Sequence, residues 1–292
     1  MASKSRFGTL FIIAAALLWS TAGVCVKFIP WSAYSIACFR SICGAILFCV
    51  YMLCTGEHKI HLHFTKWNIA GATAMFLTGI TYMNAIKLTT AANAIVLQYT
   101  APVIIIFYEM LVEHKKPSKL DLITVFCVFV GCVLAFSDQL EGGGLLGNIL
   151  ALCSGFTFAG LMVINRKPQT DAMESQLLGN LFSAVFLLPF LLTDNSVVFN
   201  QEAWTSLVIP VALFLGFFQY GSAHLCFGFG IKRTEPVSAS IIATLEPICS
   251  PLWVFLILGE QPGTMALVGF VIVIASTAVY NVLLNKKAPA ES

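Results

Sequence analysis

The chain alternates between long apolar stretches and short polar ones. Crossing a hydrocarbon core of roughly 30 Å takes about 20 apolar residues in a helix, and ten stretches approach that length. They occupy most of the sequence and leave no room for a soluble domain. The pattern predicts an all-α integral membrane protein with ten transmembrane helices, over residues 7–28, 33–54, 67–86, 90–112, 120–138, 145–165, 175–193, 203–230, 236–258 and 264–284.

Composition supports this interpretation and excludes a soluble protein. Hydrophobic residues make up 58% of the 292 residues and charged residues 10%, and the mean hydropathy is +0.88. A soluble domain of this length needs more polar surface than such a composition provides. The lipid bilayer is therefore an expected partner. No basic tract or nucleic-acid motif is present, so we expect no binding to nucleic acid.

The second half of the chain is similar to the first. At a shift of 145 residues, eight positions are identical without gaps between residues 71 and 117, including the pairs Pro102 with Pro247 and Lys87 with Lys232. Prolines and lysines are scarce within membrane spans, so these two pairs are stronger evidence for a repeat than the number of identical positions. Near the start of each half, Gly8 precedes Gly147 by 139 residues. We interpret residues 1–139 and 145–287 as two copies of one five-helix unit, here called the first and second halves.

The basic residues predict the orientation of the helices, because cytoplasmic loops are enriched in Lys and Arg. If the N-terminus is cytoplasmic, thirteen of the sixteen Lys and Arg residues fall on the cytoplasmic side. Both termini are then cytoplasmic, and an odd number of helices per half makes the two halves inverted repeats. Inverted repeats are common in secondary transporters, where the substrate binds near the middle of the membrane between the repeats.

Glu246 is the most unusual residue in this pattern, because it lies in the middle of the apolar stretch 236–258 and precedes Pro247. A carboxyl group at that depth is costly and usually faces a cavity or a polar partner. One interpretation is a proton or substrate-amine acceptor. The other is a structural role, in which the carboxyl group is held by backbone groups that the proline frees.

Two further ionisable residues lie within predicted helices. His224 is either a core histidine bonded to a carbonyl or a relay that passes protons to Glu246. Arg40 lies about two turns inside its helix. It either extends to the outer interface or holds a substrate carboxylate with its planar guanidinium.

Several polar-tipped side chains also fall within the predicted spans and are candidates for lining a substrate site. Packing or a place at the membrane interface is the alternative role for each of them. These residues are Trp19, Tyr82, Gln98, Tyr99, Asn180 and Tyr220.

We expect no metal or other cofactor. His58, His61 and His63 form a run that superficially suggests a metal site, but they stand in a predicted loop without a clear partner nearby. No nucleotide-binding motif of the Walker or Rossmann type occurs in the sequence.

Four segments resemble the EamA-type transporters of the drug/metabolite transporter superfamily. They are AAALLWSTAGVCVKF, the pair Phe39-Arg40, AIKLTTAANAIVLQYTAP and RTEPVSASIIATLEPICSPLWVFLILGE. The resemblance covers nearly the whole chain and implies a ten-helix carrier, usually an exporter of small metabolites such as amino acids or of toxic compounds. One departure is that VEHKKP in the first half stands opposite LGEQP in the second, so Glu113 and Glu260 do not align and no shared role is assigned to them.

We predict a secondary active transporter, most simply a proton-coupled exporter of a small-molecule substrate that works by alternating access. The alternative within carriers is a substrate exchanger of the nucleotide-sugar or phosphate-sugar kind, which would require several cationic residues at mid-depth. A channel would need rings of polar residues, and an enzyme would need clustered catalytic groups, neither of which the sequence provides. We expect an integral protein of the bacterial inner (plasma) membrane, as a monomer or homodimer.

Overall fold

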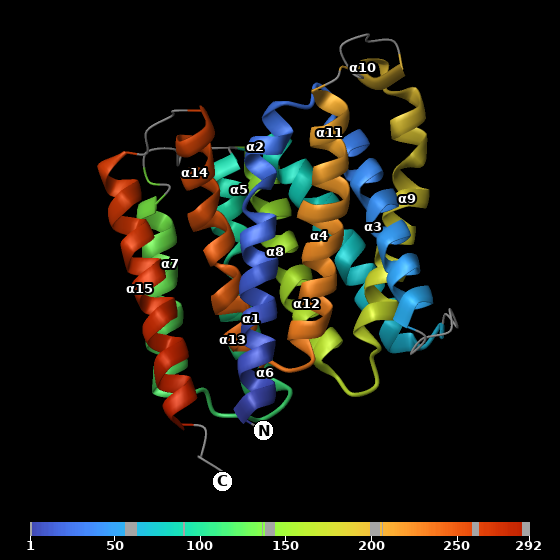
Figure 1. The fold of residues 1–292 in the computed structure, drawn as a ribbon. Coiled ribbons are helices and arrows are strands. Elements are labelled where there is room, and N and C mark those ends of the chain that lie inside the picture. The colour runs from blue at the N-terminus through green and yellow to red at the C-terminus, as the bar shows by residue number, and fades with distance from the viewer. Residues whose placement is uncertain are drawn as a thin grey trace.

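A computed structural model gives an all-helical architecture (Figure 1). It describes residues 2–55, 63–89, 91–135, 137, 144–198, 205, 207–258 and 263–287. Within these ranges every regular element is a helix, and there is no strand. Ala2 begins the first helix and Lys287 ends the last one at the same end of the bundle, which is called the terminal end below (Figure 1).

Helices occupy all ten predicted ranges, although several ranges hold more than one helix. Residues 7–28, 90–112 and 236–258 are each divided into two consecutive helices, and 203–230 contains a π-helical segment. The helices are α1 (Ala2–Trp19), α2 (Ala22–Lys27), α3 (Ala33–Thr55), α4 (Lys66–Leu88), α5 (Ala91–Gln98), α6 (Ala101–Leu111), α7 (Lys119–Ala135), α8 (Leu145–Arg166), α9 (Ala172–Thr193), α10 (Asn195–Val198), α11 (Val208–Leu213), the π-helix η3 (Phe214–Ser222), α12 (Ala223–Ile231), α13 (Pro236–Ala243), α14 (Leu245–Leu258) and α15 (Thr264–Lys287).

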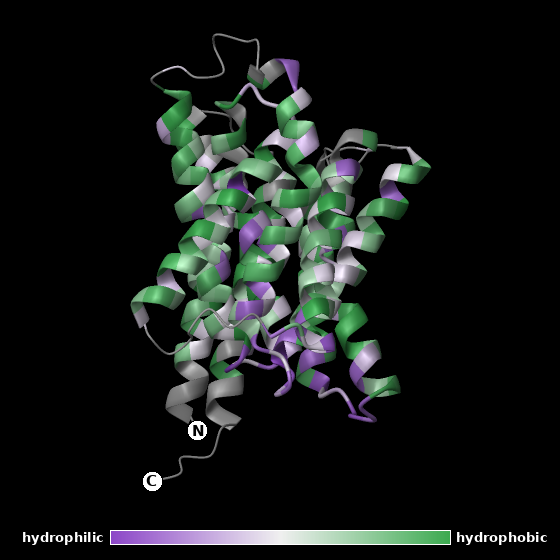
Figure 2. Cartoon of the chain, turned by 90° about the vertical axis from the view of Figure 1, so that its right-hand side faces the viewer, coloured by the Kyte–Doolittle hydropathy of each residue, from purple (hydrophilic) through white to green (hydrophobic). Residues whose placement is uncertain are grey.

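The flanks of the bundle are apolar along most of their height, and hydrophilic residues gather at the terminal end (Figure 2). Among the described residues, five helical segments are long and apolar enough to cross a membrane. Leu53, Phe126, Phe156 and Leu256 are each about two-thirds exposed on the outside of the bundle. Such large apolar side chains are stable on the surface when the surroundings are themselves apolar.

The helices of the two halves pair in a symmetric way. The most extensive contacts join α4 with α8, α3 with α9, α7 with α15 and α1 with α12. In terms of the repeat, the first helix of each half packs on the third helix of the other, and the second and fifth helices pack on their own counterparts. This exchange is the pattern that an approximate two-fold relation between the halves produces.

Two glycines show the same relation at the level of single residues. A Cβ atom on Gly8 would lie 2.6 Å from Thr234 Oγ1, and one on Gly147 would lie 2.7 Å from Thr89 N. Gly8 and Gly147 are equivalent in the repeat, and so are Thr89 and Thr234. In both halves the absence of a side chain lets the start of the first helix approach the end of the third helix of the other half.

The two divided helices α5–α6 and α13–α14 have their breaks at equivalent positions. α5 ends at Gln98 and α13 at Ala243, which are 145 residues apart. Pro102 and Pro247 follow these ends by four residues, and a proline cannot donate to the carbonyl four residues before it. The paired prolines therefore explain why both helices are interrupted at the same place.

Candidate functional site

The two helix breaks face each other across the centre of the bundle and bring Tyr99 to Glu246. The Tyr99 hydroxyl lies 2.8 Å from Glu246 Oε2 and 3.2 Å from the carbonyl oxygen of Ala243. Since Pro247 has no backbone N–H, it leaves the Ala243 carbonyl available for this contact. Tyr99 thus joins the break of the first half to that of the second.

This geometry bears on the structural interpretation of Glu246. The group that Pro247 frees is a carbonyl, which accepts hydrogen bonds and so cannot satisfy an ionised carboxylate. Within the described residues, the side chain of Glu246 takes one hydrogen bond, from Tyr99. It is also partly exposed, whereas Tyr99 and Pro247 are buried. Glu246 therefore keeps capacity for a further partner.

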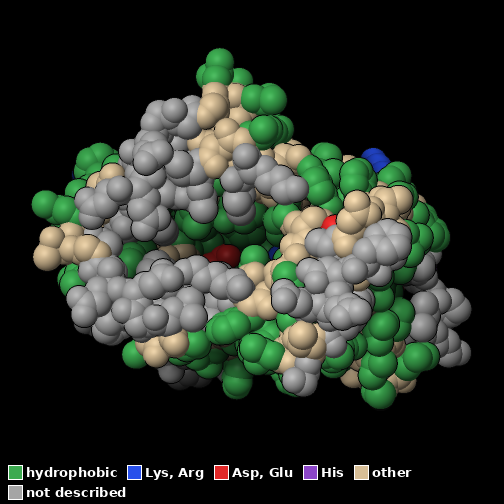
Figure 3. All heavy atoms as spheres, turned by 90° about the horizontal axis from the view of Figure 1, so that it is seen from above, with side chains coloured by type: hydrophobic (Ala, Val, Ile, Leu, Met, Phe, Trp, Pro, Cys, Tyr) green, Lys and Arg blue, Asp and Glu red, His purple; other side chains and the backbone are tan. Residues whose placement is uncertain are grey.

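The centre of the bundle is open at the end opposite the termini. Seen from that end, the surface is hollowed, and an acidic side chain lies deep in the hollow (Figure 3). Hydrophobic side chains are visible among the described parts of the rim and inside the hollow (Figure 3).

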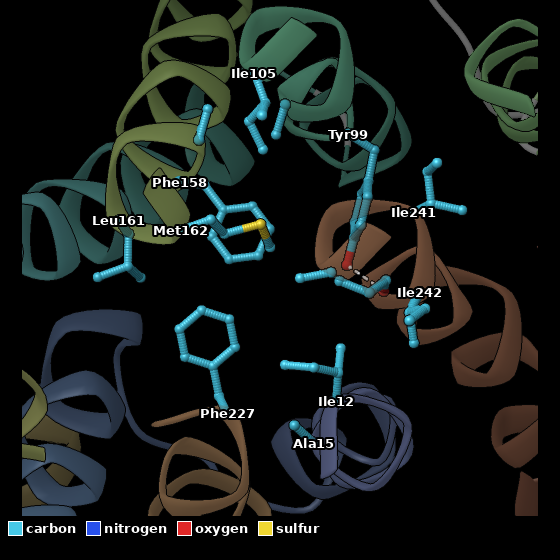
Figure 4. Close-up of a cluster of buried hydrophobic side chains, with 14 of the residues drawn as sticks. Ile12, Ala15, Tyr99, Ile105, Phe158, Leu161, Met162, Phe227, Ile241 and Ile242 are labelled. Atoms are coloured by element: carbon cyan, nitrogen blue, oxygen red, sulfur yellow. Dashed lines mark hydrogen bonds between the residues drawn. The ribbon is translucent and has the colours of Figure 1, made fainter. Parts of the chain in front are cut away.

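An apolar cluster lies on the terminal side of this region. In Figure 4, Tyr99 points toward the helix of Ile241 and Ile242, while Phe158, Met162 and Phe227 fill the space beside it. All of these except Tyr99 and Phe158 are fully buried or nearly so. Ile12 and Ile105 complete the layer from α1 and α6. Because these side chains lie between the centre and the terminal end, they close the bundle in that direction.

His224 lies in a row of rings beside the centre. Its ring centroid is 4.2 Å from that of Tyr220 and 5.2 Å from that of Trp19. Nδ1 lies 2.9 Å from the Tyr220 carbonyl and 3.4 Å from Trp19 Nε1. One nitrogen cannot donate to a carbonyl and accept from an indole at once, so the shorter contact defines the hydrogen bond. His224 makes no hydrogen bond with Glu246, and the predicted proton relay between them stays a prediction.

Arg40 is turned into the bundle. Its Cζ atom lies 4.6 Å from the centre of the Tyr220 ring, which is buried. A cation over an aromatic face is attracted by the negative charge of that face. The guanidinium lies close enough to Glu246 for an electrostatic interaction, but the two residues form no ion pair.

The other predicted site residues are distributed around the centre. Asn180 is fully buried, donates to the Gln176 carbonyl and lies close to Gly44 and Tyr220. Tyr82 packs on a small apolar cluster and has electrostatic contact with both Glu246 and Arg40. Gln98 ends α5, and its carbonyl lies against Gly155 of α8. The structure therefore brings Trp19, Tyr220, His224 and Arg40 into contact with one another, and Tyr99 into contact with Glu246.

Sequence reasoning missed two features of this region. The π-helix η3 (Phe214–Ser222) carries Tyr220, and such segments are rare and frequently occur at functional sites. Gln219 of the same segment is buried and donates to the Trp19 carbonyl over 3.2 Å. The glycines at 216 and 221 were the only local signal, because they allow irregular helical backbone.

A buried glutamate, Glu174, was also missed. It lies in the first turn of α9 at the terminal end and accepts hydrogen bonds from the backbone and ring nitrogens of His63 and from Asn68 Nδ2, at 3.3, 3.0 and 2.8 Å. Asn68 in turn accepts from the backbone N–H of Asp171. The contacts tie the start of α4 in the first half to the start of α9 in the second.

This contact also changes the interpretation of the histidine run. His58 and His61 lie outside the described residues. His63 does not only face solvent, because its ring contacts the Glu174 carboxylate. The adjacent carboxylate stabilises the protonated ring and so raises the pKa of His63. Among the described residues no group of three metal-ligating side chains comes together.

Taken together, the long apolar helices, the exposed apolar flanks and the polar centre define an integral membrane protein. The profile of the EamA-like transporter family matches the chain twice, over residues 6–137 and 145–282. The chain belongs to this family, which is part of the drug/metabolite transporter superfamily, and the double match fits a duplicated architecture. Its family is therefore one of transporters rather than enzymes.

Relatives of similar length are known from distant microorganisms. The uncharacterized transporter YwfM of Bacillus subtilis is 25% identical over 99% of this chain and 98% of its own length. The uncharacterized inner membrane transporter YicL of Salmonella typhimurium is 24% identical over 93% and 96%. A protein of known crystal structure superimposes with a TM-score of 0.78 at 18% identity, covering 94% of this chain and 97% of its own. That likeness concerns the fold alone.

Proposed function

We propose that this protein is a proton-coupled exporter of small metabolites, such as amino acids or toxic compounds, and that Glu246 couples the two movements. The observation that carries the proposal is that a partly exposed Glu246, at two facing helix breaks, takes a single hydrogen bond from the described residues. A carboxyl group with unused capacity in such a position can exchange a proton and a substrate amine. A purely structural carboxylate would be expected to have its acceptor sites filled.

The arrangement of Tyr99 suits both protonation states of Glu246. When Glu246 is ionised, the Tyr99 hydroxyl donates to it. When Glu246 is protonated, its own O–H can donate to the Tyr99 oxygen, and Tyr99 then donates to the Ala243 carbonyl. Glu246 thus keeps a hydrogen bond to Tyr99 in both protonation states, which lowers the free-energy cost of burying either the neutral or the charged form.

The orientation is part of the same proposal. Ten helices cross the bacterial inner membrane, and the terminal end faces the cytoplasm. The concentration of basic residues at that end supports this arrangement. The hollow then faces outward and the apolar cluster of Ile12, Ile105 and Phe227 closes the cytoplasmic path. Alternating access requires a second state in which this cluster opens and the outer end closes.

Proton and substrate must favour different states of one site, since a ligand without differential affinity shifts no equilibrium. Protonation of Glu246 from outside releases the substrate, and deprotonation toward the cytoplasm restores binding. The exchanger alternative has less support, because Arg40 is the one described cationic side chain placed near the centre.

The test is substrate flux in proteoliposomes with and without an imposed pH gradient. Glu246→Gln keeps the volume and a hydrogen-bond acceptor but removes titration. We expect the variant to fold and insert, to lose gradient-driven flux and to keep passive exchange. His224→Gln should slow transport less. If Glu246→Gln responds to the gradient as fully as the parent, the coupling role is refuted.

Orientation is tested separately by thiol labelling of intact cells. A cysteine at Asn195 should react with an impermeant reagent added outside, and one at Ser118 should not, each compared with the parent and its ten native cysteines. The reverse pattern would contradict the proposed orientation.

A further inference from the structure

The side chain of Arg40 is partly buried, and the described residues supply no acceptor for its guanidinium. It forms no ion pair and no hydrogen bond with any described residue, and its Nε atom is buried without a partner. A guanidinium carries five N–H donors and stays charged. Leaving such a group without acceptors inside a membrane span is costly, so an arginine there usually serves a pathway or a ligand.

The position of the Arg40 side chain excludes the alternative that its guanidinium extends to the outer membrane interface. Arg40 is the eighth residue of α3, about 10 Å along the axis from Ala33. Instead of pointing back toward the helix start, the guanidinium covers Tyr220, which lies halfway along the segment from Val208 to Ile231. The group is therefore held at depth by the ring.

A cleft opens beside the guanidinium. It is bounded by α3, α4, α9 and η3, and its polar lining includes Tyr34, Ser41, Ser183 and Tyr220. Gly79 of α4 lies on the opposite wall, and a Cβ atom there would contact nothing within 4 Å. Basic and acidic atoms are both visible deep in the hollow (Figure 3). Arg40 therefore faces a cleft rather than a fully packed interior.

We propose that Arg40 is a carboxylate-binding subsite, which restricts the substrates of this cavity to molecules that carry a carboxylate. The planar fork of a guanidinium matches the two oxygens of a carboxylate and binds them through parallel charge-assisted hydrogen bonds. Glu246, of opposite charge and not paired with Arg40, is placed to take the amine of the same molecule. The inference rests on the proposed function, in that it names the substrate class of the same cavity.

The test measures equilibrium binding to the purified full-length protein by thermal shift, without any ion gradient. The probes are matched pairs that differ only at the carboxylate: leucine and leucinamide, phenylalanine and phenylalaninamide, 3-phenylpropionate and 3-phenylpropionamide. Glucose 6-phosphate represents the phosphate-bearing class. We expect at least one carboxylate to stabilise the parent protein and its amide partner to have no such effect.

Variants then assign the effect to the guanidinium. Arg40→Gln should weaken binding of that carboxylate roughly tenfold or more, the loss expected when a charge-assisted hydrogen bond is left unmade. Arg40→Lys keeps the charge but not the fork, and should fall between the parent and Arg40→Gln. Arg233→Gln removes an exposed arginine at the terminal end and should bind as the parent does.

Four results would overturn the proposal. They are stabilisation by none of the carboxylates, equal stabilisation by a carboxylate and its amide, stabilisation by glucose 6-phosphate alone, and undiminished carboxylate binding by Arg40→Gln. Should Arg40→Gln fail to fold, Arg40→Lys decides, and an unchanged affinity in that variant counts against the subsite. Failure of proton coupling would appear only in the flux of Glu246→Gln, so the two failures are distinguishable.

Discussion

Glu174 and Glu246 are both carboxylates in the first turn of a helix, and both are largely withdrawn from solvent, yet their surroundings differ. Glu174 is 3% exposed and accepts hydrogen bonds from His63 and Asn68 at both oxygens. Among the described residues, Glu246 accepts one hydrogen bond, from Tyr99, and it remains partly exposed. Position at a helix start favours the negative charge in both cases.

The difference lies in what the rest of the fold provides. At Glu174, donors from a loop and from a neighbouring helix bond both carboxylate oxygens, so the carboxylate connects the two halves through fixed hydrogen bonds. At Glu246 the neighbouring breaks supply one donor and one further acceptor, the Ala243 carbonyl. A buried polar group that is fully bonded rigidifies a structure, whereas one that is partly bonded is available for chemistry. The comparison predicts that the two residues respond in opposite ways to substitution.

The largest effect is expected on transport. Glu246→Gln should reduce gradient-driven flux to the background of protein-free vesicles, while Glu174→Gln should retain a substantial fraction of the parental flux, because its amide oxygen still accepts from Asn68. Both variants are measured in the same proteoliposome assay after confirming equal insertion. Equal loss of flux in the two variants would remove the distinction between coupling and structural carboxylates.

The next effect is on stability, where substitution of Glu174 should have a larger effect than substitution of Glu246. Glu174→Ala removes one of the two acceptors of the buried Asn68 amide and the acceptor of the His63 backbone N–H, and should lower the free energy of unfolding by about 2–4 kcal/mol. Glu246→Ala should change it by less than about 1 kcal/mol, or raise it, since residues at functional sites are often not optimal for stability. Thermal unfolding in detergent checks both. A larger loss for Glu246→Ala would identify it as the structural residue.

A smaller effect is expected for Tyr99→Phe. The variant removes the only described hydrogen bond to Glu246 and the contact with Ala243, and should cost about 1 kcal/mol of stability. Its transport should fall because the Tyr99 hydroxyl can no longer form a hydrogen bond with either the neutral or the charged form of Glu246. Tyr280→Phe is the matched control, since Tyr280 is as buried and bonds Asp121 on the α7–α15 pair. A similar loss of transport in both variants would argue against a specific role for Tyr99.

The smallest effect concerns His63 and pH. Its folded-state pKa is raised by the Glu174 carboxylate above the unfolded value of 6.5. The protonated ring therefore stabilises the fold fully below about pH 6.5, and this contribution is lost as the pH rises through the raised folded-state pKa. The melting temperature of the parent should fall more between about pH 6 and pH 8 than that of His63→Gln. If the melting temperatures of the parent and of His63→Gln changed equally with pH, the contact between His63 and Glu174 would not contribute to the pH dependence of stability.

Much of the fold could be predicted from the sequence, because hydropathy and proline placement are local properties. The ten apolar stretches predicted where helices lie, and Pro102 and Pro247 marked the equivalent breaks. Whether all ten helices cross the membrane, and in which orientation, remains a prediction. The family followed from motifs quoted as a resemblance and is confirmed by the double family match.

The site was predicted less completely, since its geometry depends on partners far apart in the chain. The sequence itself determined that Glu246 is exceptional, because a carboxyl group inside an apolar stretch is visible without any structure. Only the tertiary structure decided that Tyr99, 147 residues away, is its hydrogen-bond donor, and that Glu174 is satisfied by residues more than 100 positions earlier. It also decided that Arg40 lies over Tyr220. Hydropathy fixes which segments are helical and apolar, but the pairing of helices fixes which polar groups meet, and that pairing arises from contacts distributed over both halves.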